Sequence, residues 1–234
     1  MSAPQGARAR IRQEVTGEIL AVARDHLGRH GSSALSLRSI ARDLEMAPSA
    51  LYRYFPGRDA LLSALILGAY ESLADDAEAA CAAALGNGGS EGARWPAVPR
   101  AMRSWSLTHP HEWSLIFGTP VPGYRAPEDT VVPYARLATA LVRPVVDARA
   151  AGRLGSSTGH PPASDALRDA VAPVAEALLP GAPASLVVLV LQAWSTLIGV
   201  ISLELFGHWN NTILEPELFF EATMAHLAST VGLV

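Results

Sequence analysis

Helical periodicity runs through almost the whole of this sequence and leaves little room for other secondary structure. Near the N-terminus, apolar residues recur every four positions, at Ile11, Val15, Ile19, Ala23 and Leu27. That spacing places them on one face of an α-helix. No stretch alternates apolar and polar residues in the way that a half-buried β-strand does. The sequence therefore predicts an all-α protein.

Glycine and proline divide the helical pattern into segments. Gly31 ends the first helix, a short second helix follows, and Pro48 can open a third because a first helical turn does not need its missing N–H. A long fourth helix begins near Arg58 and runs to the glycine-rich linker at 86–92. Beyond the linker we expect helices near 95–109, 110–118, 130–153, 164–179, 183–207 and 215–232.

The charges divide the chain into two parts. Residues 1–60 contain nine arginines and six acidic residues, a net charge of +3, whereas residues 61–234 contain nine arginines and sixteen acidic residues, a net charge of −7. We expect a small helical head at 1–60, joined by the long helix to a larger helical body at 61–234. A basic head on an acidic body indicates that only the head meets a polyanion.

Three features of the sequence indicate a cytoplasmic protein. A single cysteine, Cys81, excludes an internal disulfide and fits a reducing cytoplasm. The first residues contain no apolar segment typical of a signal peptide. Residues 184–203 carry no charge and resemble a membrane span in length, but no basic residue follows Arg168 to anchor one. We interpret this run as a helix buried by protein.

The second and third helices have the spacing of a helix-turn-helix, a motif whose second helix enters the DNA major groove. Short helical hairpins are common, however, and most of them do not bind DNA. Arg38 could reach a guanine edge. Arg8, Arg10 and Arg12 precede the expected start of the first helix and resemble a basic arm. The groups that could reach phosphate oxygens are the hydroxyls of Ser36, Ser49, Tyr52 and Tyr54 and the guanidinium of Arg58.

The segment LSLRSIARDLEMAPSALYRYFPGRDALLSALI (35–66) resembles the DNA-binding domain of TetR-family transcriptional regulators. The likeness rests on the Ile40-Ala41 pair, on ALYRYF at 50–55 and on the basic residue and leucines that open the fourth helix. It implies that Tyr52, Tyr54 and Arg58 hold phosphates and that Ile40, Leu44, Leu51 and Phe55 form the core. The complete set of predicted DNA contacts is Ser36, Arg38, Ser39, Pro48, Ser49, Tyr52, Arg53, Tyr54 and Arg58.

Two residues in the turn depart from the family pattern. Glu45 stands where the family usually has Gly, and a left-handed conformation there would cost of order 1 kcal/mol for a residue with a side chain. Ala47 replaces the usual Ser or Thr that caps the recognition helix and donates to a phosphate.

The body offers no chemistry typical of an enzyme. The nearest approach to a metal site is THPHEW, but His109 and His111 are two residues apart and so point to different faces of a helix. No Ser/His/Asp set, phosphate-binding loop or paired carboxylates occur. We therefore expect no cofactor, no metal and no catalytic residue.

Aromatic residues are concentrated in the body, where each of them could simply be part of the core. Together with a few scattered polar groups they would suit an apolar cavity for a flat or greasy ligand. The predicted lining residues are Met102, Trp105, Trp113, Phe117, Tyr134, Gln192 and Trp194.

Two segments of the body, 109–137 and 192–209, are similar to those of WHG-type TetR regulators, although Ile198 stands at the histidine position. The resemblance implies a homodimer in which 164–179 and 183–207 form a four-helix interface. Small residues in the second range, such as Ser195 and Gly199, would allow close approach of the two chains. The alternative is that 183–207 lies wholly within the core of one chain.

Three functions remain open at this stage. The first is a dimeric one-component repressor that binds a palindromic operator and is released by an apolar or aromatic molecule. The second is a dimeric DNA-binding regulator without a small-molecule inducer. The third is an all-helical enzyme, which a convergent titratable cluster in the body would support.

Overall fold

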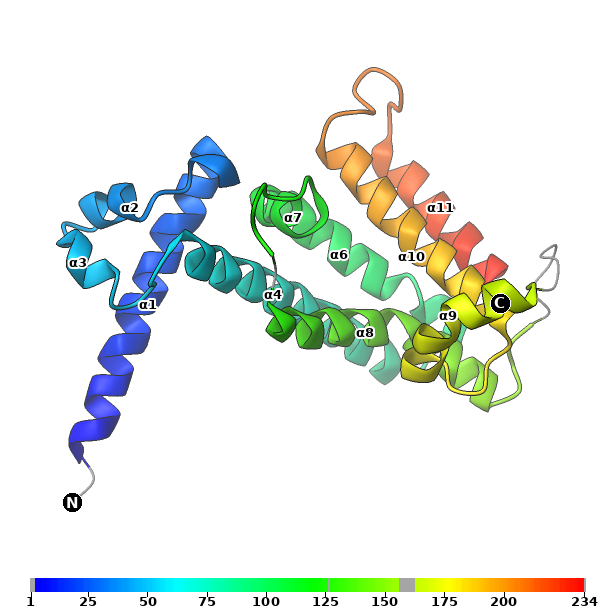
Figure 1. Cartoon of the computed structure of the whole chain (residues 1–234). Coiled ribbons are helices and arrows are strands. Elements are labelled where there is room, and N and C mark those ends of the chain that lie inside the picture. The colour runs from blue at the N-terminus through cyan, green and yellow to red at the C-terminus, as the bar shows by residue number, and fades with distance from the viewer. Residues whose placement is uncertain (1–2, 126, 156–162, 234) are drawn as a thin grey trace. The chain divides into compact units, whose positions relative to one another are not determined.

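The computed structural model describes residues 3–125, 127–155 and 163–233, and these residues form helices and connecting turns without a β-strand. The all-α prediction is confirmed. The helices, labelled in Figure 1, are α1 (Ala3–His30), η1 (Ser32–Ala34), α2 (Leu37–Asp43), α3 (Pro48–Leu51), α4 (Arg58–Gly86), α5 (Glu91–Arg94), α6 (Ala97–Thr108), α7 (Pro110–Phe117), η2 (Glu128–Thr130), α8 (Val131–Ala150), α9 (Asp165–Leu178), α10 (Ala184–Leu205) and α11 (Pro216–Thr230).

Three details differ from the sequence prediction. Helix α1 begins at Ala3, so the arginines expected to form an arm before it lie inside it. Helix α3 ends at Leu51 rather than near Tyr54, because the chain tightens there, with the Tyr54 N–H donating to the Leu51 carbonyl at 2.9 Å. The short helix α5 occupies part of the expected linker, because the Ser90 hydroxyl accepts from the Ala93 N–H at 3.3 Å and caps it.

The chain forms two compact units. The first contains the residues up to Tyr70 and His109–Thr130, and therefore holds α1 to α3, the first part of α4, and α7. The second contains Glu71–Thr108 and the residues from Val131 onward. The first unit includes the predicted head, whose boundary at residue 60 stays a prediction.

One apolar cluster holds the short helices of the first unit in place. Helix α1 contacts α2, and α2 contacts α3. Helices of four and seven residues are not stable in water by themselves, so α3 and α2 depend on this burial. The cluster consists of Ile19, Ala23, Leu35, Leu37, Ile40, Ala41, Leu51, Phe55, Leu61, Leu62, Leu65 and Val121.

Helix α10 is the centre of the second unit, where it packs against α6, α9 and α11. Among the described residues it is the helix long and apolar enough to cross a membrane, by length and composition alone. Its most apolar window has a mean hydropathy of 2.2, and 50% of that window is buried inside the protein. A half-buried ion pair ties the same helix to α6, since the Arg103 guanidinium donates to both Glu204 carboxylate oxygens, at 2.8 and 2.6 Å.

The turn between α2 and α3 has a left-handed residue at Glu45, with φ = 53°. The Met46 N–H donates to the Ala41 carbonyl at 2.8 Å, and the Glu45 N–H donates to the Arg42 carbonyl at 3.1 Å. This pair of bonds is the Schellman motif, which usually has Gly at the left-handed position. The chain therefore forms this turn with Glu45 in place of Gly, and the Glu45 Cβ makes the left-handed conformation less favourable than it would be for Gly.

Replacing Glu45 by Gly is expected to stabilise the protein by about 1 kcal/mol, because Gly adopts the left-handed conformation without a Cβ clash. The gain corresponds to a rise of roughly 2–4 °C in melting temperature for a chain of this size. Thermal unfolding followed by circular dichroism would measure it. Glu45→Ala, which keeps the Cβ, is the matched control; an equal gain from Ala would trace the effect to the carboxylate instead.

Candidate nucleic-acid interface and ligand site

The helix-turn-helix presents one face to solvent and buries the other. Of the predicted DNA contacts, Arg38, Pro48, Ser49, Tyr52 and Arg53 are exposed, Tyr52 to 44%. The positions that the family resemblance assigned to the core, by contrast, lie among buried side chains: Ile40, Leu51 and Phe55 are buried and Leu44 is half-buried. The exposed side chains thus lie on α2, on α3 or in the turn directly after α3, and the buried core fixes the orientation of these elements.

The serines of α2 lie at the edge of this face. Ser36 and Ser39 are both half-buried. Ser36 stands at the N-cap position with φ = −134°, but its side chain makes no cap hydrogen bond, and neither does Ala47 before α3. The hydroxyl of Ser36 is therefore not engaged in capping, and its contact with a phosphate stays a prediction.

Two of the predicted phosphate ligands also have partners within the first unit. The Arg58 guanidinium donates to the Ser32 carbonyl at 2.8 Å and so ties the start of α4 to η1. The half-buried ring of Tyr54 lies beneath the Arg12 guanidinium, 5.2 Å from its centroid. Both residues therefore help to position the helix-turn-helix, and their contacts with phosphates stay predictions.

Polar contacts that the sequence reasoning missed hold α2 and α7 to α1. The buried His26 ring lies 2.6 Å from the Asp43 carboxylate at the end of α2. Arg24 donates to the Glu112 carboxylate of α7 at 2.9 Å. A signal for the first contact was present, because His26 falls on the apolar face of α1 that Ile19 and Ala23 occupy, and a buried polar ring needs a partner.

Two residues of the predicted ligand pocket lie together in the first unit. The rings of Trp113 and Phe117 are 4.5 Å apart on α7, and Phe117 also meets Tyr70 edge-on at 6.0 Å. Trp113 is fully buried. The Tyr70 hydroxyl donates to the Ile116 carbonyl at 3.3 Å, so this aromatic group joins α4 to α7.

The other predicted pocket residues lie in the second unit, on α6, α8 and α10. Met102 and Trp105 are buried on α6, and the Trp105 indole N–H donates to the Ser72 hydroxyl at 3.0 Å. Tyr134 and Trp194 meet edge-on at 5.7 Å, and burial raises the pKa of Tyr134 above its ordinary value. Gln192 is exposed, on the opposite side of α10 from its buried residues.

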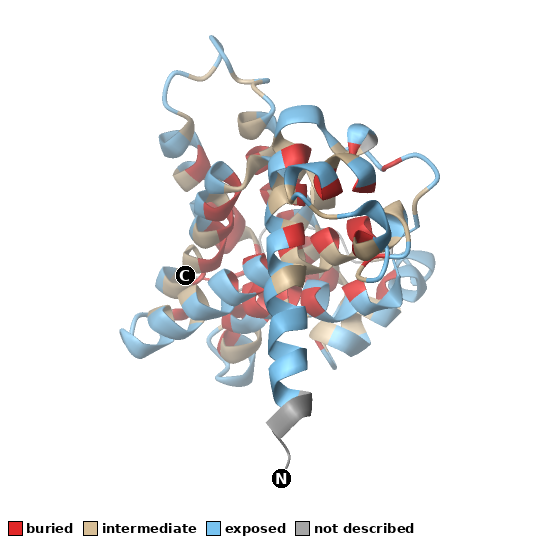
Figure 2. Ribbon diagram, turned by 90° about the vertical axis from the view of Figure 1, so that its left-hand side faces the viewer, coloured by how far each residue is buried: buried red, intermediate tan, exposed pale blue. Residues whose placement is uncertain are grey.

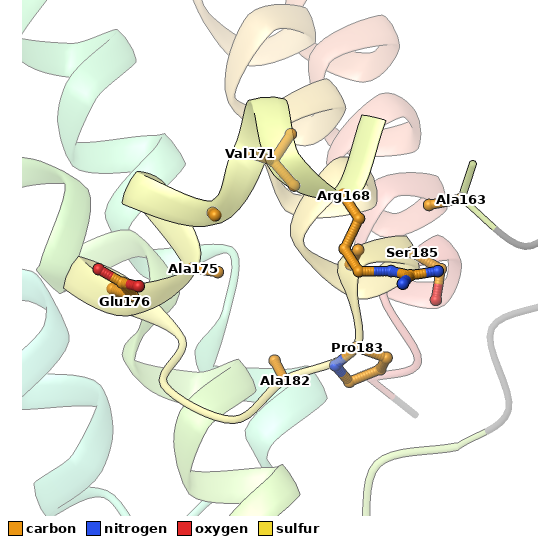
Figure 3. Close-up of a pocket in the computed structure, with 10 residues that line it drawn as sticks. Ala163, Arg168, Val171, Ala175, Glu176, Ala182, Pro183 and Ser185 are labelled. Atoms are coloured by element: carbon orange, nitrogen blue, oxygen red, sulfur yellow. The ribbon is translucent and has the colours of Figure 1, made fainter. Parts of the chain in front are cut away.

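An open, mainly apolar hollow of about 490 Å³ lies between α9 and the start of α10 (Figure 3). Arg168 and Glu176 are the charged residues of its lining, with Val171 and several alanines. None of the predicted pocket residues lines it. It lies instead on the two helical segments predicted to form the dimer interface.

A smaller hollow of about 250 Å³ separates α4 from α8. Cys81 lines it together with Arg136 and Arg143, and burial raises the pKa of the Cys81 thiol. A thiol with a raised pKa is a poor nucleophile, which agrees with a packing role for this residue. Among the residues that the structure describes, no group of His, Cys, Asp and Glu could hold a metal ion.

Two known protein families match this chain, one near the N-terminus and one over most of the remaining chain. Residues 19–65 match the family described as bacterial regulatory proteins, tetR family, and residues 95–227 match the family described as tetracyclin repressor-like, C-terminal domain. The first match covers α2, α3 and the turn between them. The second contains the two segments, 109–137 and 192–209, on which the resemblance of the body rested.

Relatives of known class align along almost the whole chain. The HTH-type transcriptional regulators Rv1816 of Mycobacterium tuberculosis (strain ATCC 25618 / H37Rv) and Mb1846 of Mycobacterium bovis are each 37% identical over 237 residues, covering 97% of this chain and 96% of the relative. The crystal structure of a regulatory protein, SCO4313, superposes with a TM-score of 0.76 at 37% identity, covering 94% of this chain and 98% of that one.

One structure with the same fold contains a ligand. RolR, crystallised with resorcinol, superposes with a TM-score of 0.53 at 16% identity, covering 95% of this chain and 94% of RolR. At this identity the likeness concerns the fold alone.

A pH-dependent contribution to stability is expected from Asp43. The hydrogen bond to His26 lowers the pKa of Asp43, and Arg42, 3.6 Å from the same carboxylate, acts in the same direction; the His30 ring lies next to His26 at 5.9 Å. A lowered carboxyl pKa stabilises the fold above the unfolded value, about 4, and this contribution is lost as the pH falls through the folded value.

Asp43→Asn should accordingly lower the melting temperature at pH 7. The difference in melting temperature between the variant and the wild type should disappear as the pH is lowered towards about 3. Melting curves across this range would test it, with the exposed Asp76→Asn as control. A difference in melting temperature that does not depend on pH would contradict the role of the carboxylate charge.

Proposed function

The chain belongs to the TetR family of bacterial transcriptional regulators, and from this premise we propose that it is a homodimeric repressor of the cytoplasm. It binds a palindromic operator through two helix-turn-helix heads. An apolar or aromatic molecule, bound in the helical body, lowers its affinity for that operator.

The observation that carries the DNA-binding part is the two-sided character of α2 and α3. Arg38 on α2 faces solvent, as do Tyr52 and Arg53 in the turn directly after α3, while Ile40 on α2 and Leu51 on α3 are fully buried. A guanidinium and a phenol fixed in this way can supply the base and phosphate contacts that a recognition helix makes. One head reads a half-site only, so a second copy completes the palindrome.

The dimer is inferred from the apolar surface of α9 and α10. Residues 184–203 carry no charge, yet half of the most apolar window of α10 is not buried in one chain. Leu167 of α9 is 39% exposed and Leu203 of α10 is 42% exposed. A second copy packed on these helices, and on the hollow between them, would remove this surface from water. Gly199 leaves room for close approach, since a Cβ there would meet nothing within 4 Å.

A ligand is inferred from the aromatic residues of the chain itself. Tyr134 and Trp194 form a partly exposed aromatic pair on α8 and α10, which offers apolar faces to a flat molecule. The alternative regulator, without a small-molecule inducer, is favoured by a different observation. Met102, Trp105 and Trp113 are at most 2% exposed, so these three side chains are already packed by protein.

Selection of binding sites from a pool of random duplexes by the purified protein tests the proposal. Enrichment of a palindrome, with a dimer mass in solution by light scattering, supports a dimeric DNA reader. Release of that duplex by small aromatic compounds then separates the two modes of control. A protein that enriches no sequence at low salt, or that binds as a monomer, overturns the proposal.

The division of labour within the head gives a further expected result. Arg38→Ala should relax the base preference at one position of each half-site, because it removes a contact with a base edge worth about 1–3 kcal/mol. Tyr52→Phe should weaken binding to all sequences by roughly the value of one hydrogen bond, about 1 kcal/mol. Titrations against the selected duplex and its single-base variants measure both. Loss of base preference in Tyr52→Phe would contradict this assignment.

A further inference from the structure

The N-terminal turns of α1 extend beyond the core of the first unit. Every residue from Gly6 to Glu14 is exposed, and Figure 2 shows this end of the helix in pale blue. The stretch contains three arginines and no acidic residue before Glu14. Apolar burial therefore does not account for these turns, and their exposed charge is positive.

The helical register separates these arginines into two faces. Val15, Ile19 and Ala23 follow one another at intervals of four and face the core of the first unit. Arg12 and Arg8 precede Val15 by three and seven residues, spacings that place them on the same face of α1, beyond the core. Arg10 is two residues from each and lies roughly on the opposite side.

Arg12 fixes this face against the recognition helix. Its guanidinium lies over the Tyr54 ring, 5.2 Å from the centroid, and donates to the Arg53 carbonyl at 3.3 Å. The face that carries Arg8 is thus turned towards the C-terminal end of α3, beside the exposed side chains of Tyr52 and Arg53. Arg8 lies one turn further along the helix axis, about 6 Å away.

Neither Arg8 nor Arg10 forms an ion pair or hydrogen bond with the described part of the chain. A guanidinium without a carboxylate partner can donate two parallel hydrogen bonds to a phosphate group. The two arginines have equal charge and similar exposure, so their positions on the helix are what distinguishes them.

We propose that the N-terminal end of α1 is a second DNA-contacting element, in which Arg8 binds a backbone phosphate and Arg12 is the positioning residue. The inference rests on the proposed function, because it assumes that the exposed face of α3 meets duplex DNA. The helix sets the direction of Arg8, which a flexible basic arm would not do. Arg10 contributes only its long-range charge.

The full-length Arg8→Gln and Arg10→Gln variants test this proposal, since they remove the same charge from the two faces of one helix. Affinity for the selected palindrome, and for a duplex of unrelated sequence, is measured by fluorescence anisotropy at several salt concentrations. Arg8→Gln should weaken binding to both duplexes about fivefold or more, and the slope of log K against log salt should fall by about 0.9 for each head. Arg10→Gln should change both quantities much less.

Equal losses in the two variants would show that only net charge matters, and no loss in Arg8→Gln would show that the contact is absent; either result overturns the proposal. Both residues are exposed, so unchanged circular dichroism and melting temperature serve as the folding control. If the wild-type protein binds no duplex at low salt, the proposed function fails together with this inference. If the wild type binds and the two variants are alike, only this inference fails.

Discussion

The apolar cluster of the first unit is the constraint on which the DNA-facing surface depends. Helices α2 and α3 span seven and four residues, too few to be stable in water without tertiary contacts. Their orientation is set by the burial of Ile40, Leu51 and Phe55 against α1 and α4. Because these three side chains are anchored, Arg38 on the exposed side of α2 and Tyr52 directly after α3 have fixed directions. A recognition surface needs this fixed geometry, since a bidentate contact with a base tolerates little displacement.

Polar contacts also fix how the helices of the first unit are oriented, and each of these contacts involves a residue of α1. Arg12 reaches the end of α3, His26 reaches the end of α2, and Arg24 reaches Glu112 of α7. At Gly28 of the same helix, a side chain would bring a Cβ to within 3.0 Å of the His111 ring, so the absence of a side chain lets α7 approach closely. The HPHEW segment, whose residue types suggested a metal site only weakly, is therefore explained by the docking of α7 on α1.

Apolar periodicity and the Gly and Pro residues that end helices predict most of this fold, but they do not predict the long-range polar contacts. The apolar spacing of α1 and the Pro-Gly break before α4 were sufficient to predict those helices, and the ALYRYF segment identified the recognition helix. The pairing of Arg58 with the Ser32 carbonyl joins residues separated by 26 positions, and no local pattern encodes such a contact. The start of α1 was placed too late because its first turns have no apolar face. The conformation of Glu45 was anticipated only as a cost, and the paired Schellman bonds explain why the turn retains it.

Two kinds of covalent connection join the second unit to the first, and under the proposed function either can carry a change towards the helix-turn-helix. Helix α4 passes from one unit to the other between Tyr70 and Glu71 without interruption, so a continuous helical backbone joins the two units. The second kind is the pair of links at the ends of the segment that carries α7, next to Thr108 and Thr130. Helix α7 is attached to α1 by the Arg24–Glu112 ion pair and to α4 by the Tyr70 ring and hydroxyl. A displacement at either end of this segment therefore acts through α7 on α1, and α1 is the helix that positions α2 and α3. Only a ligand with different affinities for two arrangements of these links would alter DNA binding, because equal affinity shifts no equilibrium.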